Sequence, residues 1–435
     1  MIIAPDWLLT SAVETPRQGW GIRIVGATVD SIGPLSSLLH DHPEEEVVDA
    51  SGHVVMPGFV NSHTHLYGVL AHGIEVKTPP TGFGSFLDDF WWPQVEDRLD
   101  QTMISAASEW GCVEMIRSGT TTFYDICEAP NALGGVLAAQ AEAIRPSGLR
   151  AILSFEATER SGVDVGQRGI AENVEFISGT GHDPLTSGLM CWHTTFTCSP
   201  AFIEQAHGLA ADLGVMSHAH ANEGTTEGEH NRRTSGEETF EVYRRLGIAG
   251  PELLASQCVQ LSNVDQDILV SSGVRVSHMP LSNCEVGGGF APVPELSSRG
   301  TVIGLGTDGY VNDMFEVMRG AFWMHKARLT DPATMPSSTV FAMATEGGAR
   351  ALGLSQIGRL EAGWSADLQV VDIRLPTDIS AENLIDQVLL WRSGHDVRDT
   401  MAAGRWLMRD RVVLTLDAQR ARERTAEEAR RLWDQ

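Results

Sequence analysis

Lysine is nearly absent from this chain of 435 residues, which contains only Lys77 and Lys326. Lysine and arginine together number 31 against 57 aspartates and glutamates, so the formal net charge is −26. A chain this acidic repels phosphate backbones and anionic lipid. We therefore expect neither a nucleic acid nor a membrane surface as a partner.

Cysteines and long apolar runs are also scarce. The six cysteines form no C-x-x-C pair, which excludes a disulfide framework and predicts reduced, packed thiols. No apolar run is long enough to span a bilayer, and the N-terminus lacks the basic and apolar regions of a signal peptide. With 42% apolar and 20% charged residues, the composition predicts a cytoplasmic globular protein with a large core.

The chain is predicted to have three parts. Residues 1–56 and 361–435 contain short strand-like runs, and the second of these segments ends in a helix rich in arginine and glutamate. Residues 57–360 alternate apolar β-type runs with longer helical stretches, which indicates a parallel sheet with helical crossovers. Over roughly 300 residues this pattern predicts a (β/α)8 TIM barrel, with a small β-sandwich domain built from both chain ends. An open doubly wound sheet is the alternative, but no Gly-x-Gly-x-x-Gly follows the first strand.

Two histidines end the first strand of the predicted barrel, in the segment PGFVNSHTH at residues 57–65. His63 and His65 are two residues apart, so on a strand their side chains point to the same face. Neutral imidazole suits zinc or ferrous iron, and active sites gather at the carboxyl ends of barrel strands. The pair is predicted to bind a divalent metal, and a chance pair of strand-end histidines is the plainer alternative.

A second motif, SHAHANE at residues 217–223, again follows a β-type run. His220 is the favoured further ligand, whereas His218 is interpreted as a structural histidine of the same strand. Glu223 follows three residues after His220. A carboxylate in this place could move protons beside a metal that activates water.

The third motif is LGTDG at residues 305–309, where an apolar strand ends in a single acidic residue, Asp308. This carboxylate could bind the metal and accept a proton from water, or it could be an ordinary turn residue. Because three separate β-ends supply His, His and Asp, we interpret Asp308 as part of the same site.

These motifs carry a resemblance to a known family. PGFVNSHTHL, HANE and LGTDG resemble the amidohydrolase superfamily, in its cytosine deaminase, S-adenosylhomocysteine deaminase and chlorohydrolase branch. The likeness runs nearly end to end, and residues 358–368 look like the family's return into its β-sandwich. Residues 90–92, 154–160 and 306–316 look most like the SsnA-type aminohydrolases.

The resemblance implies a barrel with one divalent metal ion, zinc or alternatively iron, bound by His63, His65, His220 and Asp308. Asp308 would accept the proton of an activated water, and Glu223 would protonate a ring nitrogen while water attacks the adjacent sp² carbon. The implied substrate is a small nitrogen heterocycle of purine, pterin, pyrimidine or triazine type, which loses ammonia. Barrels of this kind also imply a homo-oligomer.

The number of metal ions follows from a missing lysine. Binuclear relatives need a bridging lysine after a middle strand, and residues 152–159 contain none. A mononuclear site is therefore favoured.

Four further positions are candidates for substrate contact; His193 matches a substrate-contacting histidine of the family, and Trp92 matches an aromatic residue near the pocket. His193 and Trp92 could line the pocket or could be a buried core histidine and a core aromatic residue. His278 and Asn283 follow the next β-end, where they could contact substrate or cap a helix.

One departure from the family concerns the end of the sixth strand, where relatives read AHCVHL and this chain reads SQCVQL. Gln257 replaces the first histidine, and an amide cannot exchange a proton near neutral pH. We expect Gln257 to contact substrate or water at the site. Three alternatives stay open: a deaminase, a hydrolase with another leaving group such as chloride, and a metal-containing binding protein without catalysis.

Overall fold

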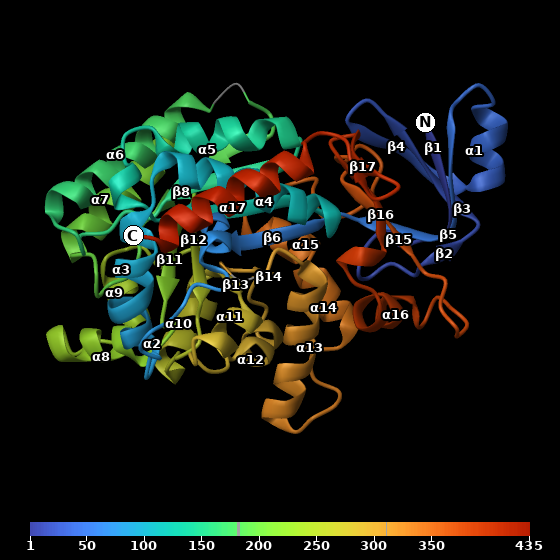
Figure 1. The fold of residues 1–435 in the computed structure, drawn as a ribbon. Helices are drawn as coiled ribbons and strands as arrows, with labels where there is room; N and C mark the ends of the chain where they lie inside the picture. The colour runs from blue at the N-terminus through green and yellow to red at the C-terminus, as the bar shows by residue number, and fades with distance from the viewer. Residues whose placement is uncertain (181–182, 310) are drawn as a thin grey trace.

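Both ends of the chain contribute to one nine-stranded sheet, which lies to one side of the molecule (Figure 1). The computed structural model describes residues 1–180, 183–309 and 311–435, so Tyr310, within a segment that carries the resemblance, lies outside the described residues. The strand order is β18-β17-β16-β15-β5-β1-β3-β4, and β2 pairs with β1. The strands are β1 (Ile2–Leu8), β2 (Arg17–Gln18), β3 (Trp20–Val25), β4 (Thr28–Pro34), β5 (Val47–Pro57), β15 (Leu368–Asp372), β16 (Val397–Ala402), β17 (Arg405–Arg409) and β18 (Val412–Val413).

The two chain ends meet at the antiparallel pair β5–β15, in which Val55 faces Val370. Residues of both ends form a core of their own, separate from that of the barrel and including Ile3, Ile22 and Leu368. The expected β-rich domain is therefore confirmed, and its hydrogen bonds follow one continuous path from β18 to β4.

Parallel strands make up the rest of the fold. They fall into two hydrogen-bonded groups, β6-β7-β8-β9 and β10-β11-β12-β13-β14. A parallel bridge between Thr64 and Asp308 joins the first group to the last strand, and β9 and β10 are successive pieces of one strand broken at Leu189. Eight strand positions thus close into the expected (β/α)8 barrel. The strands are β6 (Phe59–Thr64), β7 (Thr120–Cys127), β8 (Arg150–Phe155), β9 (Thr186–Gly188), β10 (Met190–Cys191), β11 (Ser217–Ala221), β12 (Leu253–Gln257), β13 (Arg275–His278) and β14 (Ile303–Leu305).

Helices surround the barrel (Figure 1). Those between the barrel strands are η1 (Leu66–Ala71), α2 (Phe83–Phe86), η2 (Leu87–Trp91), α3 (Trp92–Gln94), η3 (Glu96–Arg98), α4 (Gln101–Arg117), η4 (Pro130–Ala132), α5 (Val136–Ile144), η5 (Arg145–Ser147), α6 (Val163–Gly179), α7 (Pro200–Leu213), α8 (Thr225–Thr234), α9 (Thr239–Arg245), α10 (Asn263–Ser272), α11 (Pro280–Glu285) and α12 (Val293–Ser298). The others are α1 (Leu35–Asp41), α13 (Met314–Leu329), α14 (Ser337–Met343), α15 (Glu346–Ala351), α16 (Leu384–Trp391), η6 (Gly394–Asp396) and α17 (Ala418–Trp433). Among the described helices, none combines the length and the apolar character needed to cross a membrane.

Local signals in the sequence account for several helix ends. The Ser199 hydroxyl accepts a hydrogen bond from the Phe202 amide, Pro200 occupies the first turn of α7, and the helix stops at the left-handed Gly214. Helix α10 begins at Ser262 and stops at the left-handed Gly273 in the same way. Such caps set where each crossover returns to the barrel, and so which strand-end residues face the central cavity.

Candidate metal centre and active site

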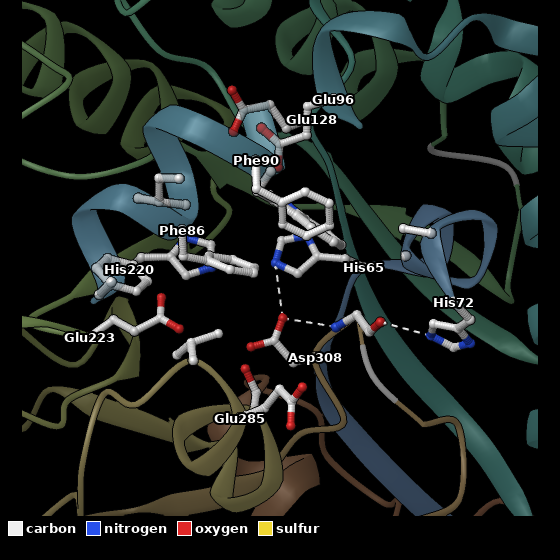
Figure 2. A pocket seen from close by; sticks show the side chains of 18 of the residues that line it. His65, His72, Phe86, Phe90, Glu96, Glu128, His220, Glu223, Glu285 and Asp308 are labelled. Carbon is white, nitrogen blue, oxygen red and sulfur yellow. Dashed lines mark hydrogen bonds and ion pairs between the residues drawn. The ribbon is translucent and has the colours of Figure 1, made fainter. Parts of the chain in front are cut away.

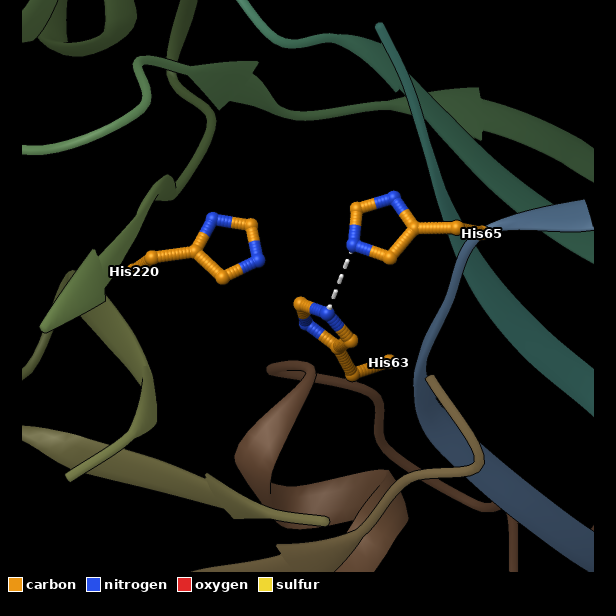
Figure 3. Close-up of side chains that lie close together, drawn as sticks. All are labelled: His63, His65 and His220. Carbon is orange, nitrogen blue, oxygen red and sulfur yellow. Dashed lines mark hydrogen bonds between the residues drawn. The ribbon is translucent and has the colours of Figure 1, made fainter. Parts of the chain in front are cut away.

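Two strand ends place the three predicted histidine ligands together (Figure 3). His63 and His65 come from β6 and its carboxyl end, and His220 comes from the end of β11. Their ligand atoms all lie within 4.8 Å of one another, and the three side chains are buried. The spacing of two along β6 therefore brings both imidazoles to one centre, as the strand pleat requires.

Asp308 completes this group just after β14. Its Oδ1 lies 3.5 Å from His65 Nε2 (Figure 2). The amides of Thr307 and Asp308 both donate to the His63 carbonyl, at 2.9 and 3.1 Å, which fixes the end of β14 against β6. Asp308 has a φ of 60°, a left-handed conformation that costs a non-glycine residue energy and often occurs at functional sites.

The histidine rings are oriented by partners on their other nitrogens. His65 Nδ1 lies 2.8 Å from the Ile126 carbonyl, so it carries the proton and Nε2 turns toward the centre. His220 Nδ1 lies 2.6 Å from Glu156 Oε1. His218, on the same strand as His220, has both nitrogens occupied by Cys191 and Ser256 and stays outside the centre.

The donor set of three imidazoles and one carboxylate fits a divalent metal of the zinc type. Although burial opposes ionisation, the neighbouring histidines, His65 foremost, lower the pKa of Asp308, so its carboxylate is charged. Burial also lowers the pKa of His63 well below its usual value and keeps that imidazole neutral, the form that binds metal.

Glu223 lines the same cavity (Figure 2). Burial and the negative charge of Asp308 raise the pKa of Glu223 to about 8. The carboxyl group is therefore largely protonated near neutral pH and can donate a proton, as a general acid must.

Gln257 takes part in a chain of hydrogen bonds. Its Nε2 donates to Asp308 Oδ2 at 2.8 Å, and its Oε1 accepts from Asn283 Nδ2. Gln257 has a φ of 71°, again in the left-handed region. The Gln257 amide thus holds the Asp308 carboxylate, and Asn283 in turn holds the amide.

The other predicted site residues lie at different distances from the cavity. His193 lines it, and its Nδ1 lies 2.9 Å from Thr197 Oγ1. Trp92 lies behind His193 and packs edge-on against it, with ring centroids 6.0 Å apart. His278 lies away from the cavity and faces His325, with their Nε2 atoms 3.2 Å apart.

The cavity around this centre has a volume of about 500 Å³. Apolar and aromatic residues line one part of it, and histidines and carboxylates line the remainder. Four of the lining carboxylates were not singled out from the sequence, namely Glu96, Glu128, Glu156 and Glu285. The sequence did carry a signal for one of them, since Glu156 falls within residues 154–160, a stretch that carries the resemblance.

Comparison with known proteins places this geometry in a family. The model of the amidohydrolase family matches residues 54–407. A 5-methylthioadenosine/S-adenosylhomocysteine deaminase of Syntrophobacter fumaroxidans is 33% identical over 410 residues, 93% of this chain and 91% of the relative. A 5'-deoxyadenosine deaminase of Methanothermobacter thermautotrophicus is 33% identical over 90% of both chains.

Solved structures share the fold. An adenosine deaminase from Xanthomonas campestris with bound zinc superposes with a TM-score of 0.89 at 24% identity, covering 100% of this chain and 98% of the other. A zinc complex of atrazine chlorohydrolase from Arthrobacter aurescens gives a TM-score of 0.84 at 20% identity, over 98% and 99% of the two chains. This protein, with its closed barrel and its histidine-rich centre, belongs to the amidohydrolase family.

Proposed function

We propose that the protein is a mononuclear, zinc-dependent aminohydrolase that releases ammonia from an adenosine-type heterocycle. The observation that carries this is the convergence of His63, His65, His220 and Asp308 on one point, with protonated Glu223 in the same cavity. Relatives at 33% identity are named as deaminases of 5-methylthioadenosine, S-adenosylhomocysteine and 5'-deoxyadenosine, which supports the substrate class.

Each residue has a distinct role in this proposal. His63, His65, His220 and Asp308 would hold a zinc ion, which would supply a Lewis acid for activating water near neutral pH. Asp308 accepts the proton of the attacking water at a carboxylate oxygen. Glu223 delivers its proton to the ring nitrogen beside the attacked carbon, and Gln257 keeps Asp308 in place through its 2.8 Å hydrogen bond.

Gln257 also favours a second candidate. The family histidine at this position can carry a positive charge, whereas an amide cannot. The alternative reaction at the same centre is therefore the displacement of a leaving group that needs less electrostatic assistance, such as chloride.

The test is ammonia release from 5'-methylthioadenosine, S-adenosylhomocysteine and 5'-deoxyadenosine, with 6-chloropurine riboside as the halogenated comparison. We expect ammonia from at least one amine, and a fall of about a hundred- to ten-thousandfold in kcat for Glu223→Gln. Glu229→Gln, an exposed glutamate of α8, is the matched control. Release of chloride but never of ammonia would replace the proposal with the second candidate.

Elemental analysis tests the metal independently of turnover. We expect about one zinc per chain, lost in His63→Ala and retained in Glu223→Gln. Protein that binds no metal after reconstitution would contradict the proposed centre.

A further inference from the structure

Three glutamates form a second group beside the metal centre. Glu96 belongs to η3, Glu128 follows β7, and Glu156 follows β8. Their exposed fractions are 3%, 1% and 2%, and all three line the cavity. Figure 2 shows Glu96 and Glu128 together on the side of His65 that faces away from Asp308 and Glu285.

One arginine faces this group. The Arg160 guanidinium lies 3.2 Å from Glu96 and 2.9 Å from Asp97, and it also donates to Glu128. Both carboxylate oxygens of Glu96 have partners, since the oxygen that does not face Arg160 accepts a hydrogen bond from the Tyr67 hydroxyl at 2.8 Å. A single positive charge is thus shared among several acidic groups, although buried carboxylates need close partners to remain charged.

The carboxylate of Glu128 is only half satisfied. One oxygen contacts Arg160, and Oε2, buried and at the cavity wall, has no hydrogen-bond partner among the described residues. Glu156 approaches His220 at 2.6 Å, so its carboxylate lies between the metal centre and the glutamate group. A buried acceptor without a partner is costly unless something fills the place.

Apart from its histidines, the described wall of the cavity carries no basic side chain. Among the described residues that line it, none is a lysine or an arginine. Another part of the wall is aromatic: the rings of Phe86 and Trp91 are stacked with centroids 5.6 Å apart, and Phe90 meets Trp91 edge-on at 6.0 Å. Aromatic faces attract organic cations, particularly where water is excluded.

We propose that Glu128 and Glu156, with the aromatic wall of Phe86, Phe90 and Trp91, form a subsite for a protonated amine carried by the substrate. This inference rests on the proposed function, because the reacting ring must lie at the metal centre while its amine substituent reaches the glutamates. Among adenosine-type heterocycles, the subsite thereby favours those with a cationic amine, and it repels substituents that bear phosphate or carboxylate without such an amine.

The first experiment compares 5'-amino-5'-deoxyadenosine, cationic near neutral pH, with neutral 5'-deoxyadenosine. We expect kcat/KM to favour the amine by about tenfold or more, a difference that one charged hydrogen bond supplies. Glu128→Gln should abolish this preference by lowering kcat/KM for the amine to the value for the neutral substrate. Glu285→Gln, which removes an exposed carboxylate elsewhere on the cavity, should keep the preference. Equal kcat/KM for both substrates in the wild type would overturn the subsite and leave the proposed function standing.

A binding measurement needs no turnover, so it distinguishes a failure of the proposed function from a failure of the proposed subsite. Benzylamine should raise the thermal midpoint of the zinc-loaded protein at concentrations where benzyl alcohol does not, and Glu128→Gln and Glu156→Gln should each remove this difference. If no adenosine-type compound reacts but benzylamine still binds in this way, the proposed function fails and the subsite is supported. Equal stabilisation by both probes overturns the subsite. So does a second metal ion per chain that is lost in Glu128→Gln, because the cation would then be a metal.

Discussion

Gln257 illustrates how a single side chain can replace part of a family's usual chemistry. Its amide can donate to Asp308 Oδ2 and accept from Asn283 at the same time, which a neutral histidine could also do. An amide has only one charge state, however, so its hydrogen bond to Asp308 persists across the working pH range. The residue therefore suits a positioning role better than proton transfer.

Replacing Gln257 by alanine tests that role. Asp308 then loses its 2.8 Å hydrogen bond and can turn away from the histidines, so metal affinity should fall by about ten- to a hundredfold. Competition with a chromogenic chelator measures this loss. Gln260→Ala, at the exposed glutamine three residues further on, is the control and should retain wild-type affinity. Unchanged metal affinity in Gln257→Ala would contradict the positioning role.

Glu223 predicts the pH dependence of turnover. Its pKa, raised by burial and by Asp308 to about 8, means that the group is protonated below this pH and ionised above it. Because the general acid must carry a proton, kcat/KM for ammonia release should be high below about pH 8 and fall as the pH rises through it. Rates measured between about pH 6 and pH 10 give the profile, and Glu229→Gln should keep the same falling limb. A profile that stays flat across this range would exclude Glu223 as the acid.

At the scale of elements, the barrel could be predicted because its strands are apolar runs that alternate with helical segments. Three motifs could be predicted because each lies directly at a strand end, where the barrel makes them neighbours. They are the His-Thr-His sequence at residues 63–65, HANE at 220–223 and TDG at 307–309. Strand β1 and helix α1 were not singled out, since β1 contains Pro5 and α1 has only seven residues. The glutamate group was missed for a different reason: its members lie on η3 and on loops after β7 and β8, and only the tertiary structure joins them.

The end of β14 packs so closely against β6 that adding a single methyl group there tests the contact. A Cβ added at Gly306 would lie 2.7 Å from His63 Cβ and 2.8 Å from the His63 carbonyl. Gly306→Ala should therefore force the two strands apart, lower the free energy of unfolding by about 1–3 kcal/mol and weaken metal binding through His63. Urea unfolding and zinc titration measure the two effects.

A second glycine provides the control. Gly208 lies exposed in α7 with open space around its Cβ position, so Gly208→Ala should leave zinc binding unchanged and stabilise the fold by about 0.5–1 kcal/mol. If Gly306→Ala behaved like Gly208→Ala, the close approach of β14 to His63 would not constrain the centre.

On the scale of the whole molecule, the chain returns from the β-rich domain to the active-site side of the barrel. Helix α17 lies against α4 (Figure 1) and ends beside the segment that follows His65, where the Trp433 indole donates to the Leu70 carbonyl at 2.7 Å. Along the way Arg420 and Arg424 both contact the buried Glu109 of α4, at 3.1 and 2.6 Å. The last helix thus links the two parts of the fold and compensates an acidic side chain in the interior of a strongly acidic protein.

The double variant Arg420→Ala/Arg424→Ala tests this link. Glu109, only 4% exposed, would lose both positive partners and remain covered by α17. Because the arginines themselves are partly exposed, we expect a loss of about 1–3 kcal/mol in the free energy of unfolding, below the cost of a fully buried broken pair. Glu109→Gln introduced into the double variant should restore much of the loss, since it removes the unpaired charge. Arg422→Ala, an exposed arginine of the same helix, should be near neutral in urea unfolding. If Arg422→Ala destabilised the protein as much as the double variant, the effect would belong to the change in net charge, and the pairing with Glu109 would not be what holds α17 in place.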